Sequence, residues 1–178
     1  MPSYKGLDEL LRRMAAPNSR ATFEKDVIPG LIDVWVDDYT RGRKGSEIVE
    51  TAVESFSYLF DIAESRLIAA WGISRGRHGG KRDASRMAGH PLSAGDKYHR
   101  GHAIAHTLGG GTDINLVAQL GSINIGPFRV LEREAINTPG ALYFTYWLYD
   151  AQGTQKPSGV EQGLLCIGKP AKLTRHAN

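Results

Sequence analysis

Histidines that could move protons are concentrated in the middle of this sequence. Five of the six histidines lie between residues 78 and 106, and His102 and His106 are four residues apart. A neutral imidazole, with an ordinary pKa of about 6.5, accepts a proton from water at physiological pH. The same spacing on a helix would suit zinc, as in H-E-x-x-H proteases, although Ala103-Ile104-Ala105 leaves no glutamate between the two. The pair therefore indicates a general base or a zinc ligand, with a buried structural histidine as the plain alternative for His106.

Side chains suited to a hard cation follow His102 along the chain. They are Asn115, Gln119, Asn124 and Glu132. An amide oxygen is a neutral, hard ligand that suits a magnesium ion retaining most of its waters. One base and one hydrated divalent ion are sufficient to hydrolyse a phosphodiester. Asn and Gln in glycine-rich loops also form caps and turns, so the residues alone leave both readings open.

The spacing of these residues resembles the DNA/RNA non-specific endonuclease family, the His-Me finger or ββα-metal nucleases. Arg100-Gly101-His102 matches the end of the family's D-R-G-H signature, and the run from Asn124 to Glu132 matches N-x-G-x-[aromatic]-x-x-L-E. The stretch from Arg100 to Gly110 is similar to R-G-H-L-I-A-H-x-x-G-G of the branch found in bacterial polymorphic toxins. The similarity covers about residues 97–165. His99 stands where the family has aspartate, and Ala118 stands where it usually has proline.

The resemblance implies a role for each matched residue. His102 would be the general base, and Asn124 would be the protein ligand of Mg²⁺, with Mn²⁺ as a substitute. Glu132 would orient metal-bound water or the surroundings of His102. Asn115 and Gln119 would hold the loop or touch substrate. An arginine would clamp the phosphate, and the candidates are Arg75, Arg77, Arg82, Arg86 and Arg100, the last being placed with the catalytic group.

Basic residues are unevenly distributed along the chain. Residues 1–70 carry nine Lys or Arg and twelve Asp or Glu, whereas residues 71–178 carry thirteen and seven. A basic segment suits a polyanion, because each neutralised phosphate releases condensed counterions. A solvated linker is the alternative for the stretch from Ser74 to Arg100. We predict substrate contacts from Arg75, Arg77, Lys81, Arg82 and Arg86.

Periodicity predicts which elements carry these residues. Helical patterns cover Leu7 to Ala16, Thr22 to Tyr39 with a break at Pro29-Gly30, and Ser46 to Trp71, where apolar residues recur every three or four positions. A glycine-punctuated stretch of about 27 residues follows. A helix is expected over Pro127 to Ile136, and strands over Ala141 to Tyr149 and Ser158 to Leu165.

These patterns and the resemblance together predict an α+β protein. A helical N-terminal region, residues 1–73, would serve in docking, capping or dimerisation. Residues 74–178 would form a ββα-metal nuclease core with a small antiparallel sheet and a basic loop over 74–100.

Composition limits the cellular setting. The single cysteine, Cys166, excludes an internal disulfide and a cysteine-based zinc site. No run of about 18 apolar residues and no apolar signal segment is present, so neither a membrane span nor a Sec signal is expected. We predict a cytoplasmic protein, or one delivered out of the cell by a dedicated secretion system.

The leading hypothesis is an Mg²⁺-dependent endonuclease that hydrolyses DNA, RNA or both with little sequence specificity. Such a nuclease would suit a bacterial toxin effector with a cognate immunity or inhibitor protein, and a homodimer is compatible with the sequence. The first alternative is a catalytically inactive nucleic-acid-binding module of the same fold. The second is a docking or dimerising N-terminal region with a basic tail, in which residues 101–178 would have no stable core.

Overall fold

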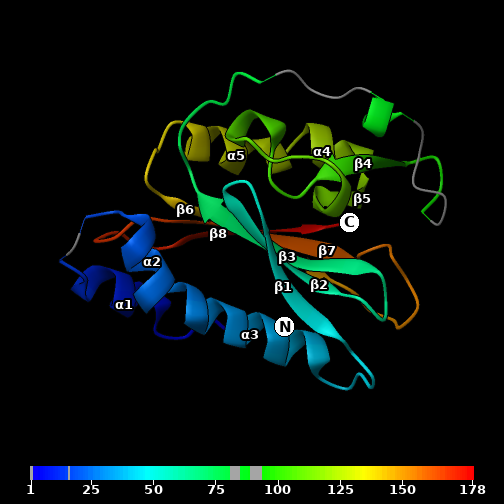
Figure 1. The fold of residues 1–178 in the computed structure, drawn as a ribbon, viewed down its shortest axis with the longest axis horizontal. Coiled ribbons are helices and arrows are strands. Elements are labelled where there is room, and N and C mark those ends of the chain that lie inside the picture. Colours follow the sequence, from blue (N-terminus) through cyan, green and yellow to red (C-terminus); the bar gives the residue numbers. More distant parts are fainter. Residues whose placement is uncertain (1, 16, 81–84, 89–93) are drawn as a thin grey trace.

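A six-stranded antiparallel sheet lies at the centre of the computed structural model, which describes residues 2–15, 17–80, 85–88 and 94–178. The strand order is β1-β2-β3-β6-β7-β8. Helices α1 to α3 cover one face of the sheet, and a second layer made of strands β4 and β5 with helices α4 and α5 covers the other (Figure 1). The predicted α+β class is confirmed.

Three helices form the first layer. They are α1 (Leu7–Arg13), α2 (Arg20–Asp26) and α3 (Ile28–Thr40). The pattern from Thr22 to Tyr39 is split as predicted, because α2 ends before Val27 and α3 begins with Pro29 in its first turn. Proline is tolerated there, since the N–H it lacks would have no partner within the helix.

The helix predicted from Ser46 to Trp71 is wrong. This segment forms three strands, β1 (Ile48–Val53), β2 (Phe56–Asp61) and β3 (Arg66–Ile73). Tight turns separate them, with Glu54 at φ 57° and Ser65 at φ 50°, although neither turn contains glycine or proline. The segment is rich in β-branched and aromatic residues, which favour strands. The N-terminal region is therefore helical only as far as α3.

The strands before and after residue 74 belong to one sheet. β3 pairs with β6 (Leu142–Leu148) from Ala69 opposite Tyr146 to Ile73 opposite Leu142. β7 (Gly159–Leu165) and β8 (Lys172–Ala177) complete the sheet. The two strands predicted near the end of the chain are confirmed. The predicted boundary after residue 73 falls between two strands that are hydrogen-bonded to each other.

Aromatic packing fixes the first layer to the sheet. The fully buried ring of Trp35 lies 5.6 Å from Trp71 and 5.1 Å from Phe144, measured between ring centroids. Trp35 Nε1 donates to the Tyr4 hydroxyl at 3.0 Å, and this hydroxyl donates to Glu161 on β7 at 3.0 Å. Residues from the start of the chain, α3 and the sheet therefore share one core.

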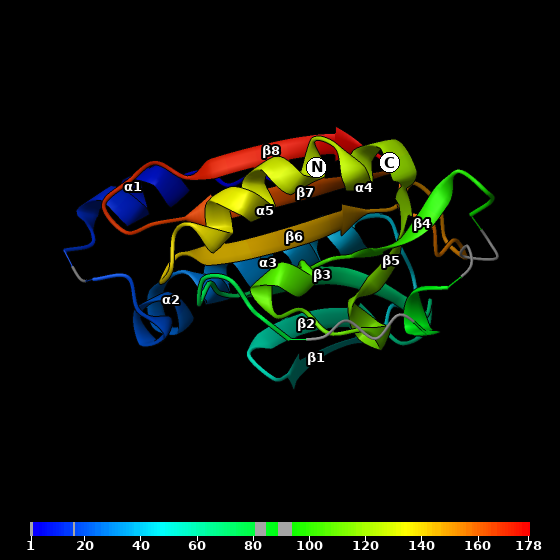
Figure 2. The same cartoon turned by 90° about the horizontal axis from the view of Figure 1, so that it is seen from above.

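The second layer has the order strand, strand, helix. β4 (Tyr98–His102) pairs with β5 (Leu116–Leu120), and α4 (Gly121–Ile125) and α5 (Phe128–Ile136) follow directly (Figure 2). Short 3₁₀ turns occupy Ser85–Met87, His106–Leu108 and Asp113–Asn115. α5, which confirms the predicted helix, buries Phe128 with its ring centroid 6.1 Å from that of Trp147.

Asn178 ties β5 to the end of the large sheet. Its Oδ1 accepts the Leu120 N–H at 2.7 Å, and its Nδ2 donates to the carbonyls of Ala118 and Pro157, both at 2.9 Å. The side-chain amide therefore occupies the place that a neighbouring strand would take along β5. None of the helices in the described ranges combines the length and the apolarity needed to cross a bilayer.

The shared core leads to a stability prediction. Trp35→Ala should lower the free energy of unfolding of the whole chain by about 3–5 kcal/mol, because it empties a buried aromatic site under the sheet. Urea titration followed by far-UV circular dichroism and by tryptophan fluorescence should give one coincident transition, with Asp33→Ala, an exposed position on α3, as the control. Two separate transitions would show that α1 to α3 unfold independently of the sheet.

Candidate active site

One cavity of about 360 Å³ brings together residues from four separate parts of the chain. Its lining residues are Arg77, His102, Ala105, His106, Thr107, Asn124, Arg129, Glu132, Arg133 and Ile136. His102, Asn124 and Glu132 are the residues that the family resemblance assigns to proton transfer, metal binding and water orientation. The fold therefore places these three side chains around one space.

Each of the three comes from a different element of the second layer. His102 is the last residue of β4 and is 7 % exposed, Asn124 lies on α4, and Glu132 lies on α5. The glycine before His102 is required by packing, since a Cβ on Gly101 would lie 2.3 Å from Gln119 Oε1 and 2.6 Å from Gln119 Cβ. Because Gly101 has no side chain, the buried Gln119 side chain can lie directly against β4 at this position.

Asn115 fixes the backbone just after His102. Its Oδ1 accepts the Ile104 N–H at 2.8 Å, and its Nδ2 donates to the carbonyls of Ile104 at 2.8 Å and Gly111 at 2.9 Å. The backbone N–H of Ala103 also donates to the Asn115 carbonyl at 2.8 Å. Asn115 is fully buried, and these hydrogen bonds, which hold the loop after His102, are called the Asn115 clamp below.

Burial raises the pKa of Glu132 from its usual range to about 7, and nearby Arg129 and Arg133 oppose this shift. The carboxylate is largely enclosed by the helix and the cavity wall, where its charged form is poorly solvated. A carboxyl group with a strongly shifted pKa inside a cleft is typical of functional sites. Three arginines, Arg77, Arg129 and Arg133, line the same cavity, so the cavity is suited to an anion.

The histidines that the structure describes do not form a conventional zinc site. The rings of His102 and His106 are 6.3 Å apart between centroids, and His78 lies a further 5.9 Å beyond His106. In the part of the chain that the structure describes, no three His, Cys, Asp or Glu side chains come close enough to hold a metal ion together. The zinc alternative therefore gains no third ligand from the described residues.

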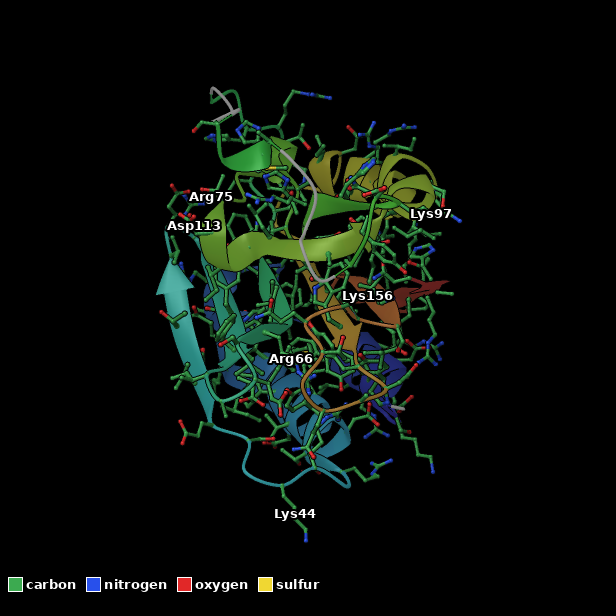
Figure 3. All side chains as sticks on the ribbon, turned by 90° about the vertical axis from the view of Figure 1, so that its right-hand side faces the viewer. Lys44, Arg66, Arg75, Lys97, Asp113 and Lys156 are labelled. Carbon is green, nitrogen blue, oxygen red and sulfur yellow. The ribbon has the colours of Figure 1, made fainter. Side chains whose placement is uncertain are left out.

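The other predicted site residues lie in several places. Arg100 lines a different cavity of about 590 Å³ together with Arg66 and Asp113. Gln119 is fully buried behind Gly101, and Arg75 lines a cavity next to the first one. Arg75 lies just after β3, and Figure 3 shows it well separated from Arg66. Lys81 and Arg82 lie outside the described residues, as does the side chain of Arg86.

Two cavity arginines were missed by the sequence reasoning. Arg129 and Arg133 flank Glu132 on α5 and line the cavity. The available signal was that Arg129 lies three residues before Glu132 and four residues before Arg133, because residues three or four apart share a helix face. With Arg77 they bring three guanidinium groups to the lining of the cavity.

Comparisons with known proteins bear on the fold. No protein-family model matches the sequence, and no curated protein matches it. The structure is similar to NucA from Streptococcus agalactiae with no metal bound, with a TM-score of 0.50 and 16% identity over 81% of this chain and 91% of that chain. It is also similar to NucA with a magnesium ion bound, with a TM-score of 0.50 and 14% identity over 80% of this chain and 89% of that chain. This chain has the fold of the NucA nucleases. At this identity the likeness concerns the fold alone and assigns no role to the cavity residues.

The loop that holds His102 gives a prediction about Gly110. A Cβ at this position would lie 1.9 Å from the Ile104 carbonyl oxygen and 2.8 Å from Asn115 Nδ2. Gly110→Ala should therefore break the Asn115–Ile104 pairing and lower the free energy of unfolding by about 1–3 kcal/mol. Gly111→Ala is the matched control, because a Cβ there meets no atom within 4 Å. Equal unfolding midpoints for the two variants in urea would show that the Asn115–Ile104 hydrogen bonds do not stabilise the loop.

The raised pKa of Glu132 predicts a pH-dependent stability. A folded-state pKa of about 7 means that ionisation destabilises the folded chain as the pH rises from about 4.5 through 7. Glu132→Gln does not ionise, so in EDTA it should be more stable than the wild type by about 1–3 kcal/mol at pH 8, with a much smaller difference at pH 5. Urea unfolding at both pH values measures this. A difference that stays constant between them would contradict the raised pKa.

Proposed function

We propose that this protein is a metal-dependent endonuclease that hydrolyses phosphodiester bonds of DNA, RNA or both. The observation that carries the proposal is the single cavity in which His102, Asn124 and Glu132 meet with Arg77, Arg129 and Arg133. The shared fold with NucA nucleases supports it, as does the resemblance of residues 97–165 to the ββα-metal nucleases.

The donor set in the cavity fits Mg²⁺, with Mn²⁺ as a substitute. Asn124 supplies a neutral amide oxygen and Glu132 a carboxylate, both hard oxygen donors of the kind that Mg²⁺ prefers. A magnesium ion held by one or two protein oxygens keeps most of its sites for water and phosphate. When bound, the ion would supply stabilisation of the charge that develops on the phosphate and on the departing oxygen.

Residues of the chain would perform the other steps of the reaction. His102 accepts the proton of the attacking water, and the Asn115 clamp on the loop behind it keeps its position fixed. Glu132 orients water beside it. Arg77, Arg129 and Arg133 offer guanidinium groups to the phosphate, where charge-assisted hydrogen bonds are strongest as negative charge accumulates.

We expect this cavity to recognise the phosphate backbone of a nucleic acid rather than its base sequence. Arginines that contact phosphates position a nucleic acid without reading its sequence. We therefore propose little sequence specificity. The similarity of Arg100 to Gly110 to the toxin branch extends the proposal to a toxin effector with an immunity or inhibitor protein as its partner. A homodimer and the route of delivery stay predictions from the sequence.

A second candidate function is an inactive nucleic-acid-binding module. It is favoured by one specific observation, the histidine at position 99 where the family has aspartate. In the structure, the His99 ring lies against Gly121, where an added Cβ would be 2.8 Å from its Cε1. Activity measurements separate this candidate from the enzyme.

The decisive test is cleavage of plasmid DNA and of an RNA substrate in Mg²⁺ and in EDTA. The wild type should cleave only with Mg²⁺, and His102→Ala should cleave about 10²–10⁴-fold more slowly while binding nucleic acid normally, because it removes the general base. Asn124→Ala should lose activity at low Mg²⁺ and recover part of it at high Mg²⁺.

Three results would contradict this proposal in different ways. No Mg²⁺-dependent cleavage by the wild type would favour the inactive module. A His102→Ala variant with half the wild-type rate would remove His102 as the base. Stoichiometric zinc in the purified protein, released by His106→Ala, would make His102 a zinc ligand.

A further inference from the structure

A second cavity of about 290 Å³ adjoins the active-site cavity. Its lining residues are Glu54, Ser55, Phe56, Arg75, Gly76, Arg77, His78, Leu108 and Gly109. Arg77 lines both cavities, so its guanidinium lies at their common boundary. The two cavities therefore follow one another across the surface rather than lying on different faces.

The segment that carries the basic residues of this second cavity is held rigidly. Ser74 Oγ donates to the Ala135 carbonyl on α5 at 2.6 Å, and the Ser74 N–H donates to the Ala141 carbonyl at 2.9 Å. The Gly76 N–H donates to Ser74 Oγ at 3.2 Å, and the His78 N–H donates to the Thr107 carbonyl at 2.8 Å. A backbone fixed at both ends needs no further ordering when its side chains bind a ligand, which lowers the entropic cost of binding.

The turn at Gly76 places the two arginines on either side of it. Gly76 has φ 83°, a conformation that glycine adopts without strain, and it is buried between exposed Arg75 and Arg77. A Cβ at Gly76 would lie 3.5 Å from Pro139, so the neighbouring loop packs closely against the turn. The glycine thus permits a sharp turn that displays both guanidinium groups.

The charge of this second cavity favours an anion. Within the described residues, no carboxylate forms an ion pair with Arg75 or Arg77, and the only acidic residue of the lining is Glu54. His78 adds a ring that meets His106 edge to face, with 5.9 Å between centroids and 80° between planes. This edge contact leaves His78 at the boundary between the two cavities.

We propose that this second cavity binds the phosphate that neighbours the scissile phosphate on the same nucleic-acid strand. The inference rests on the proposed nuclease function and makes its substrate a polynucleotide strand rather than a small phosphodiester. Consecutive phosphates of a strand would occupy the consecutive cavities, and Arg77 would contact both. Arg75 lines the second cavity but not the first, so it is the residue that would contact the neighbouring phosphate alone.

Binding without cleavage tests the subsite first. A fluorescent single-stranded oligonucleotide is titrated with the protein in EDTA at several salt concentrations. Arg75→Ala should bind about tenfold more weakly, and the slope of log affinity against log salt should fall by about 0.7, the value for one lost phosphate contact. Arg20→Ala removes the same charge from an exposed position on α2 and should match the wild type. An Arg75→Ala variant that binds like Arg20→Ala would overturn the subsite.

A second variant changes the cavity in the opposite direction. Glu54→Gln removes the one carboxylate from the lining at an exposed turn and should tighten oligonucleotide binding severalfold. Weaker or unchanged binding would contradict an anion at this position.

Cleavage kinetics then separate the subsite from the proposed function. With Mg²⁺, Arg75→Ala should raise KM for an oligonucleotide about tenfold more than for bis(p-nitrophenyl) phosphate, a diester with no neighbouring phosphate. Equal effects on both substrates would place Arg75 at the scissile phosphate and overturn the subsite. Failure of the wild type to cleave either substrate would overturn the nuclease function, and the binding experiment in EDTA would still decide the subsite.

Discussion

The burial of strands β3 and β6 on both faces is the constraint on which the rest of the structure depends. Nearly every side chain of the two strands is buried. Two buried faces require two covering layers, so the chain before β1 provides α1 to α3, and the chain between β3 and β6 provides β4, β5, α4 and α5. The candidate site lies in this second layer, at the point where residues 74–78 leave β3 and contact α5. The layer that holds the candidate site is therefore an insertion between two adjacent strands of the core.

The site could be predicted largely from local spacing, whereas the sheet could not. Asn115, Asn124 and Glu132 lie close together in the sequence, and their separation reflects strand β5 followed by the helices α4 and α5. The prediction of a helix from Ser46 to Trp71 failed because apolar spacings of three and four also arise when short strands are joined by turns. Turns at Glu54 and Ser65 carry none of the usual glycine or proline signals. Arg129 and Arg133 were missed because a helix face is ambiguous until its neighbours are known.

The charges around Glu132 would couple binding of the proposed metal ion to protonation of this carboxylate. Burial raises the pKa of Glu132 to about 7 although Arg129 and Arg133 oppose the shift, so desolvation is the stronger effect. A metal ligand must be deprotonated, and a cation at this carboxylate therefore competes with a proton near neutral pH. The arginines favour the ionised carboxylate and offer hydrogen bonds to phosphate. They also repel a free cation, so cation and phosphate are expected to favour each other's binding.

The histidine at position 99, where the resembling family has aspartate, lies in the strand pair β4–β5 and is not one of the described residues that line the cavity. His99 lies on β4 opposite Gln119, and its ring packs over Gly121 at the start of α4. The described residues that line the cavity do not include it. Since the base, the amide, the carboxylate and the arginines come from other positions, an effect of His99 on His102 passes through the backbone of β4 or the placement of α4. Asn115 holds the loop after β4, and Asn178 holds the end of β5 just before α4. The histidine at position 99 therefore leaves the described lining of the cavity intact.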